Sequence, residues 1–306
     1  MTKRTRSPRP DGRVVKRRKP LRNHESDKHR PSSKINRIES SASPLSQCPS
    51  PVIHPFKDQE ASIEWGNPLY SYVYKRKNSF VFKVKINSQP YMLKVFKFYD
   101  PSATKWSWGR GLDEDYPIEK AIYYTDPFYA ECRAYGRIKE AAEKGEIRGK
   151  IAAKCHGYLF LNADAQRWLR TNGYDLGAGY FSDDLLAMQG GFGRPRAIVK
   201  DLEIEGPGVA DQTPQQIRKS FWGVRQLNLL GIYNRDVRAE NFRNGWLVDF
   251  DMSCTIPYDI YDSLPSFEAH TMKGRDLVSF EDMLEEAGVK IRFLRTKYYN
   301  FRLRRK

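Results

Sequence analysis

The stretch GIYNRDVRAENFRNGWLVDFDMS, residues 231–253, gathers acidic and amide side chains around one predicted turn. The Asn-Gly pair at 244–245 has apolar residues on both sides, which is typical of a tight β-hairpin. Such a hairpin brings Asn241 close to Asp249, and Asp236 lies in the loop just before it. Oxygen ligands of these types suit a hard cation such as Mg²⁺, which in turn holds phosphates. The alternative is that Asn and Asp only serve the turns.

A helix is predicted directly upstream, over residues 213–230. Thr213 is a suitable N-cap, Pro214 suits the first helical position, and Gln216 completes a capping box. Gly231 is a typical residue to end a helix. The polar stretch therefore follows a well-defined helix.

The front half of the chain predicts a β-hairpin over residues 80–98, with the turn at Asn-Ser-Gln-Pro. Apolar residues alternate on both strands, and Lys94 shares a face with Met92 and Phe96. A buried lysine needs a partner, because an unpaired buried charge is costly. The alternative is an edge-strand lysine whose ammonium group reaches water.

A second helix is predicted from Pro127, with Asp126 as its N-cap, to about Lys144-Gly145. Glu131 lies on its inward stripe, between Phe128 and Tyr135. Glu131 and Lys94 could therefore neutralise each other inside the protein.

Two further strands are predicted at residues 151–161 and 197–204. The stretch between them is irregular and contains Gly-Gly-Phe-Gly at 190–193. It follows no strand and opens no helix, so it is expected to be an inserted loop and not a phosphate-binding loop.

These motifs resemble those of protein kinases: NRDVRAEN is similar to the catalytic loop HRDLKPEN, and VDFD is similar to the DFG element. The resemblance implies an α+β, two-lobed protein-kinase-like fold. A small β-rich N-lobe with insertions is expected over residues 63–205 and a truncated helical C-lobe over 206–306. A disordered basic tail is expected over residues 1–62.

The resemblance also implies roles for single residues, with ATP and Mg²⁺ as possible cofactors. Asp236 matches the catalytic base, and Arg238 would steady the γ-phosphate. Asn241 and Asp249 match the metal ligands. The remaining matches are the expected nucleotide-binding residues, namely Lys94 and Glu131 together with Asp201 and Glu203 of the hinge-like segment VKDLEIE.

A narrower resemblance is carried by DPFYAECRAYGRI, KCHGYLFL, AIVKDLE and LGIYNRDVRAENFRNGWLVDFDMSCTIP. These segments are similar to the fungal kinetochore Sim-complex subunit family of the Fta type, within the protein-kinase-like superfamily. The resemblance covers roughly residues 63 to 285. It implies a nuclear protein at kinetochores or centromeres, with other subunits of such a complex as partners.

The sequence departs from the kinase pattern at several points. SYVYKRKNSFVF has no glycine-rich loop, so the backbone is not expected to approach phosphates closely. Asn234 stands in place of the catalytic-loop histidine, Arg238 in place of its lysine, and Asp251 in place of the DFG glycine. Only 57 residues follow Asp249, too few for all the helices of a kinase C-lobe.

Charge is concentrated at the two ends of the chain. The net charge is +16, and residues 1–50 alone hold 14 Lys and Arg against 4 Asp and Glu. Residues 1–62 are rich in Ser, Pro and basic residues, as expected of a disordered tail. Basic clusters within residues 3–19 predict a nuclear import signal that binds an import receptor. The alternative is a solvated tail that contacts DNA or other anions.

The C-terminal segment 290–306 holds 8 Lys and Arg and no acid. It predicts either a basic helix that contacts nucleic acid or a partner, or a solvated helix. No apolar run has the length of a membrane span or a signal peptide, so no membrane role is expected. The four cysteines are scattered without a CxxC pair, which argues against a zinc site and for a reducing compartment.

Three functions remain open on the sequence. The first is a degenerate kinase that acts as a nuclear interaction module. The second is an active ATP- and Mg²⁺-dependent phosphotransferase, because the site residues are retained. The third is a basic nucleic-acid-binding protein that uses both ends of the chain.

Overall fold

The computed structural model describes residues 52–69, 78–103, 116–203 and 208–291. The predicted import signal, most of the glycine-free loop and most of the basic C-terminal segment lie outside these residues.

A five-stranded antiparallel sheet forms the first part of the fold, in the order β1-β2-β3-β5-β4. The predicted hairpin over 80–98 is confirmed, and its turn residues Asn87 and Ser88 both have positive φ. The two further predicted strands are also present, with narrower bounds. The strands are β1 (Ile63–Pro68), β2 (Ser79–Ile86), β3 (Gln89–Phe96), β4 (Cys155–Phe160) and β5 (Arg196–Lys200).

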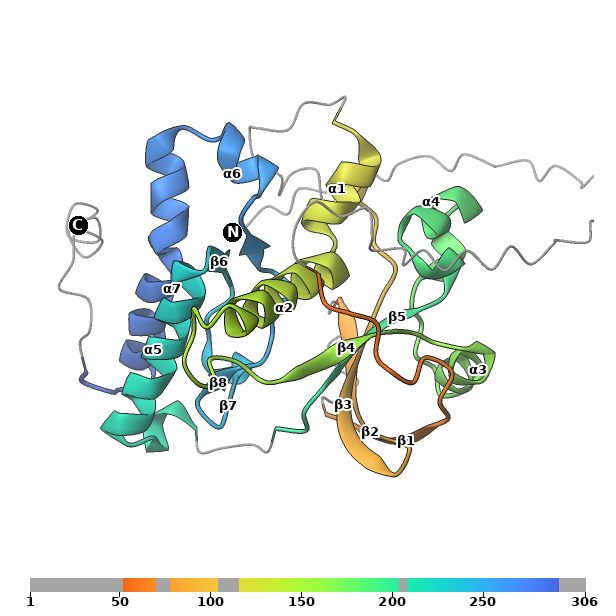
Figure 1. The fold of residues 1–306 in the computed structure, drawn as a ribbon, viewed down its shortest axis with the longest axis horizontal. Coiled ribbons are helices and arrows are strands. Elements are labelled where there is room, and N and C mark those ends of the chain that lie inside the picture. The colour runs from red at the N-terminus through yellow and green to blue at the C-terminus, as the bar shows by residue number, and fades with distance from the viewer. Residues whose placement is uncertain (1–51, 70–77, 104–115, 204–207, 292–306) are drawn as a thin grey trace, which may run out of the picture. The chain divides into compact units, whose positions relative to one another are not determined.

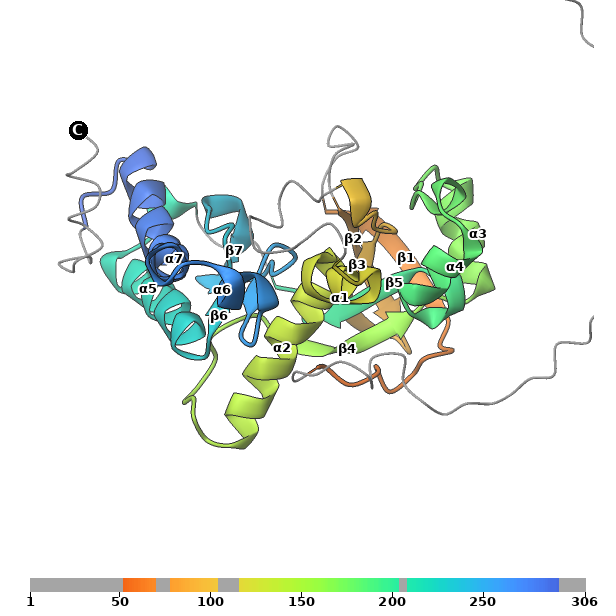
Figure 2. The same ribbon diagram turned by 90° about the horizontal axis from the view of Figure 1, so that it is seen from above.

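Helices cover both faces of this sheet (Figures 1 and 2). α1 (Ile118–Thr125) and α2 (Pro127–Glu143) lie on one side, and α3 (Ala163–Thr171) and α4 (Asp183–Met188) lie on the other. The strand alternation supplies two separate apolar clusters. Phe82, Leu93 and Val95 pack on the α3 side, while Phe96 and Ile198 pack on the α2 side. Lys94 therefore faces α2, since side chains alternate along a strand.

The predicted helix at 127 is confirmed as α2. The carboxylate of Asp126 accepts a hydrogen bond from the backbone N–H of Phe128 at 2.8 Å, and Pro127 occupies the first turn. The helix ends at Glu143 and is followed by Gly145 with φ of 71°. The local sequence therefore sets both ends of the helix, because Asp126 caps its start and Gly145 follows its end.

The segment between β4 and β5 was predicted to be an inserted loop, and this prediction is wrong. It contains α3 and α4 and two single-turn 3₁₀ helices, η2 (Ala178–Tyr180) and η3 (Gly191–Gly193). Asn162 and Ser182 cap the two α-helices. Trp168 of α3 stacks on Trp65 of β1, with ring centroids 4.3 Å apart. Both helices are short. α3 buries Ala165 and Leu169, and packing of this kind stabilises short helices more than their intrinsic helix propensity does, whereas α4 has no fully buried residue.

The second part of the fold is mainly helical. α5 (Pro214–Leu229) has the predicted capping box, and α7 (Ser266–Glu286) runs beside it, with Phe221 and Phe280 in contact. Asn244 and Gly245 have positive φ at the tip of the predicted hairpin. The short elements are η4 (Val209–Asp211), β6 (Ile232–Tyr233), η5 (Ala239–Asn241), β7 (Phe242–Arg243), β8 (Trp246–Leu247), β9 (Cys254–Thr255) and α6 (Asp259–Ser263).

Residues 52–62 do not belong to the tail in which the sequence placed them. Ile53 and Phe56 are buried, and the backbone N–H of Phe56 donates to the carbonyl of Tyr158 at 2.7 Å. The predicted tail boundary at 62 is therefore too late. The sequence signal was weak, because only a few apolar residues in a polar segment make these contacts.

The fold class is the expected one: α+β, with a β-rich N-lobe that carries α2 followed by a short helical C-lobe. Within the described part of the chain, no helix is both long enough and apolar enough to cross a membrane.

Candidate functional site

Lys94 on β3 is the centre of a buried charge cluster. Its side chain is 1% exposed, and its Nζ lies 2.7 Å from Oε2 of Glu131 and 2.7 Å from Oδ1 of Asp249. The predicted pairing of Lys94 with Glu131 is therefore present. It joins the sheet to α2, and the contact with Asp249 joins both to the segment after the β7-β8 hairpin.

Glu131 is fully buried and is held by two lysines. Its Oε1 accepts a hydrogen bond from Nζ of Lys200 at 2.7 Å, and Lys200 also donates to the carbonyl of Val248 at 2.8 Å. Lys200 was not predicted as a site residue. A signal was present, because Lys200 and Ile198 occupy alternate positions of β5 and so face the same side as Lys94.

Asp251, which stands where the DFG motif has glycine, also contacts Lys94. Its Oδ2 lies 3.2 Å from the lysine Nζ, and its backbone N–H donates to Oδ1 of Asp249 at 3.1 Å. The sequence identified Asp251 only as the loss of a flexible residue. The turn that begins at Asp249 aims both carboxyl groups at the same ammonium group. Phe250 between them is buried against Tyr135 of α2.

Burial and mutual attraction shift the pKa values within this cluster. Burial lowers the pKa of Lys94, but Asp249, Asp251 and Glu131 raise it well above its ordinary value. Burial raises the pKa of Asp249, and attraction to Lys94 and Lys200 outweighs it, so that carboxyl stays ionised. Burial raises the pKa of Asp251 to about 7, opposed by Lys94 and assisted by the charge of Asp249. With Asp251 protonated, two lysines balance two carboxylates.

The residues of the predicted catalytic loop contact one another. Asp236 accepts a hydrogen bond on Oδ2 from Nδ2 of Asn241 at 2.8 Å, and Nη2 of Arg238 lies 3.1 Å from the same oxygen. Asn241 also donates to the Asp236 carbonyl at 2.9 Å. The Oδ1 oxygen of Asn241 is thus the atom that could ligate a cation, and the Asp236 carboxylate is 31% exposed.

Asn234 links this loop to the charge cluster. Its Nδ2 donates to the carbonyl of Asp249 at 2.6 Å, and its Oδ1 accepts from the N–H of Asp236 at 3.1 Å. The residue in the histidine position therefore positions both aspartates.

Asp276 on α7 binds the backbone of the catalytic-like loop, and the sequence did not predict it as a site residue. Its carboxylate accepts hydrogen bonds from the backbone N–H groups of Asn234 at 2.6 Å and Arg235 at 2.8 Å. It also accepts from the Asn228 amide at 2.9 Å. Asp276 is buried four positions before Phe280, so a charged residue on an apolar helical stripe was the available signal.

Asp201 and Glu203, the two acidic residues predicted to bind nucleotide from the hinge-like segment, make their side-chain contacts with residues outside the cluster. Asp201 contacts His156 at 2.6 Å, and Glu203 pairs with Lys150. The N–H of Glu203 donates to the carbonyl of Asp201 at 3.0 Å. Side chains and backbone of this segment are thus used in internal contacts.

The fit of this site to Mg²⁺ is mixed. Asp249 and Asn241 offer the oxygen ligands that Mg²⁺ prefers. However, Oδ1 of Asp249 is already bound by the Lys94 ammonium group, and a cation would compete with that positive charge. Among the described residues, no group of three or more His, Cys, Asp or Glu is arranged to hold a metal ion.

A protein-family model named "Kinetochore Sim4 complex subunit FTA2" matches residues 41–254, more than half of the chain. The chain belongs to this family. The match includes every residue of the cluster and of the catalytic-like loop and ends before α7. No curated protein sequence matches the chain.

Solved structures of kinase-like proteins resemble this FTA2-family chain only loosely. Vaccinia related kinase 3 has 9% identity and a TM-score of 0.34, covering 67% of this chain and 52% of that chain. The PAN3 pseudokinase of Neurospora crassa has 10% identity and a TM-score of 0.32, and the match covers 76% of this chain and 50% of that chain. The chain thus spans about half the length of these proteins. Similarity at this level carries no argument about activity.

Proposed function

We propose that this FTA2-family chain is a kinetochore-complex subunit whose kinase-like core acts as an interaction module and not as a phosphotransferase. The family match supports the first half of the proposal. The observation that carries the second half is the number of carboxyl groups that contact the Lys94 ammonium group. A lysine ammonium group has three donors, and here three carboxyl groups, those of Glu131, Asp249 and Asp251, surround it.

This arrangement opposes nucleotide binding in two ways. Lys94 has no donor left for a phosphate unless one of its carboxyl partners withdraws. An incoming polyphosphate also brings negative charge toward the ionised Asp249, and like charges in a poorly solvated site repel strongly. The hinge-like segment adds a third obstacle, because its Glu203 N–H is bonded to the Asp201 carbonyl.

The alternative function is an active ATP- and Mg²⁺-dependent phosphotransferase. The 2.7 Å contact of Lys94 with Glu131 favours it, because a paired lysine and glutamate are needed to position the nucleotide phosphates. In that case Asn241 and Asp249 would hold the cation, and Asp236 would accept the proton of the attacking hydroxyl while Arg238 steadies the γ-phosphate. Asp251 would first have to leave Lys94.

Replacement of the chain in cells by site variants tests the proposal. Asp236→Ala removes the only predicted base, and the residue is partly exposed, so the fold should tolerate the change. We expect cells that carry this variant to segregate chromosomes normally and the variant to co-purify with its complex. Defective segregation by a variant that is abundant and still assembled would contradict the proposal and favour the phosphotransferase.

Nuclear localisation and DNA contact are separate proposals that rest on the basic segments. Residues 3–19 would bind an import receptor, and the basic ends would contact DNA. Deletion of residues 1–22 should make the protein diffuse through the cell. A protein that stays nuclear after the deletion would refute the import signal.

A further inference from the structure

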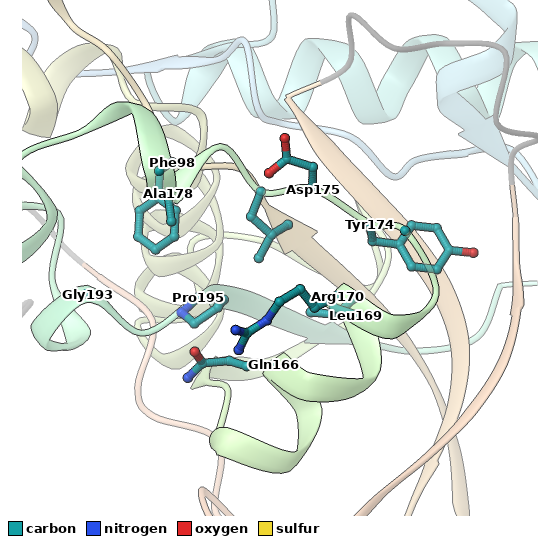
Figure 3. A pocket seen from close by; sticks show the side chains of 12 residues that line it. Phe98, Gln166, Leu169, Arg170, Tyr174, Asp175, Ala178, Gly193 and Pro195 are labelled. Carbon is teal, nitrogen blue, oxygen red and sulfur yellow. The ribbon is translucent and has the colours of Figure 1, made fainter. Parts of the chain in front are cut away.

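The inserted segment between β4 and β5 builds a cavity that is separate from the charge cluster (Figure 3). Its volume is about 520 Å³, within the roughly 300–1,000 Å³ range of ligand-binding pockets. The lining combines apolar side chains with a few polar ones at its edge. The apolar part is formed by Phe98, Leu169, Leu176 and Pro195.

A backbone hydrogen bond and an aromatic stack fix the wall of this cavity. The N–H of Phe98, just beyond the end of β3, donates to the carbonyl of Leu176 at 2.9 Å. The ring of Tyr174 turns away from the cavity (Figure 3) and stacks on Trp168 with ring planes at 11°. The cavity is therefore a preformed feature of the fold.

Arg170 supplies a cation at the cavity. Its guanidinium group points toward Gln166 and Pro195 in Figure 3, and among the described residues no ion pair or side-chain hydrogen bond engages it. Neighbouring arginines differ, because Arg167 pairs with Asp164 and Arg194 donates to backbone carbonyls. The alternative is that Arg170 interacts only with the C-terminal end of α3, where a positive charge is favourable. Its position in the cavity lining adds a reason to expect an acidic ligand.

Exposed aromatic side chains lie in two of the segments that line the cavity. Tyr180 follows the lining residue Gly179 and is 84% exposed, and Phe192 precedes the lining residue Gly193 and is 88% exposed. Together they place exposed aromatic surface in the segments that form the cavity wall. Exposed aromatic groups around a pocket are typical of protein–protein contact sites.

The backbone that presents Phe192 is unusual. Gly190, Gly191, Phe192 and Gly193 have φ values of 87°, 65°, 53° and 77°. A positive φ is easy for glycine, whereas the left-handed conformation of Phe192, with φ 53° and ψ 43°, is costly for a residue with a side chain. Phe192 adopts this conformation although its side chain is exposed and does not contribute to the core, which motivates the hypothesis that the ring contacts a partner.

We propose that this surface binds a linear peptide segment of a partner protein in which an acidic residue lies next to a large apolar residue. The apolar side chain enters the cavity, the carboxylate pairs with Arg170, and Tyr180 and Phe192 pack on the flanking residues. A phosphate backbone fits less well than a peptide with a single carboxylate. Arg170 pairs with one negative charge, whereas the further charges of a phosphate backbone would lie near Asp175, which lines the cavity, and near Asp183 and Asp184, which begin α4. The inference extends the proposed interaction function, but it does not depend on the state of Lys94.

Panning a phage-displayed library of random linear peptides on the full chain tests this inference. We expect the enriched peptides to share an Asp or Glu beside Leu, Phe or Trp. Their synthetic versions should bind Arg170→Ala on the order of tenfold more weakly than wild type, as expected for a lost charge-assisted hydrogen bond. Arg167→Ala, on the same helix, is the matched control and should bind like wild type. Replacing the peptide acid by lysine should restore binding to Arg170→Glu.

A second variant separates binding from folding. Phe192→Asn removes the ring and places a residue that tolerates a left-handed backbone. It should weaken peptide binding several-fold without lowering the unfolding midpoint. Failure to enrich such peptides, or enriched peptides that bind Arg170→Ala as tightly as wild type, would overturn the proposal. The proposed function would be unaffected by that failure, since its own test is chromosome segregation with Asp236→Ala.

Discussion

The carboxyl group of Asp251 lies 3.2 Å from the ammonium group of Lys94, on the face of the sheet that α2 covers. In the kinase pattern this position is glycine, which has no side chain to reach the lysine. The substitution therefore adds a third carboxyl partner to a residue whose other two partners are Glu131 and Asp249. The charge cluster is complete without a nucleotide, and this is the basis of the proposed interaction function.

The raised pKa of Asp251 predicts a pH-dependent stability. Folding raises this pKa to about 7, against about 4 in an unfolded chain. A group with a raised pKa stabilises the fold fully below its unfolded pKa, and the contribution is lost as the pH rises through the folded pKa. We expect the free energy of unfolding to fall by on the order of 2 kcal/mol between about pH 5 and about pH 8.

Asp251→Asn, whose amide does not titrate, is the control for that experiment. Lys94, Asp249 and Glu131 face Asp251 in both proteins, so the difference between the two pH profiles isolates the Asp251 carboxyl. Chemical denaturation at each pH gives the free energies. Parallel profiles for wild type and variant would mean that Asp251 is ionised throughout the range.

Asp276 should be the main anchor of the catalytic-like loop. Asp276→Ala leaves the N–H groups of Asn234 and Arg235 without an acceptor, and each unsatisfied buried donor costs about 1–3 kcal/mol. We expect a loss of about 3 kcal/mol in the free energy of unfolding and faster hydrogen exchange at Asn234 and Arg235. Asp276→Asn keeps one acceptor oxygen and should lose less. Unchanged exchange at these amides in Asp276→Ala would contradict the anchoring role.

Alanine substitutions at two glycines with similar φ values distinguish the cost of backbone strain from the cost of a side-chain clash. Gly191 has φ of 65°, and a Cβ there would lie 2.3 Å from the Phe160 ring, whereas Gly145 has φ of 71° and open space around it. Gly145→Ala should cost about 1 kcal/mol from strain alone. Gly191→Ala should cost about 1–3 kcal/mol more, because the Phe160 ring has to move. Equal thermal unfolding midpoints for the two variants would show that the Phe160 ring can move aside at little cost in free energy.

Local sequence signals predicted the elements that carry their own start and end marks. Asp126 and Pro127 began α2, Thr213 and Gln216 capped α5, and the Asn-Gly pair at 244–245 placed the β7-β8 hairpin. The pairing of Lys94 with Glu131 followed from two inward-facing charges that each needed a partner. These features depend on neighbours in sequence or on the rule that buried charges are paired.

What the sequence did not predict depends on contacts between distant segments. α3 and α4 are short, and α3 is held by the burial of Ala165 and Leu169, which depends on the sheet it packs on. Lys200 and Asp276 act through residues on other elements, so their roles needed the three-dimensional arrangement. Asp251 was noted only as a missing glycine, because the direction of its side chain depends on the turn after Asp249.

The most direct measurement is isothermal titration calorimetry of Mg²⁺-ATP into the wild-type chain and into Asp251→Gly. Asp251→Gly removes one carboxyl from Lys94 and restores the residue of the kinase pattern. The account predicts no saturable binding to the wild type and measurable binding to the variant, lost again when Asp249→Asn is added. Saturable binding to the wild type that Asp251→Gly does not tighten would contradict it, because Lys94 would then be available to phosphates despite its three carboxyl partners.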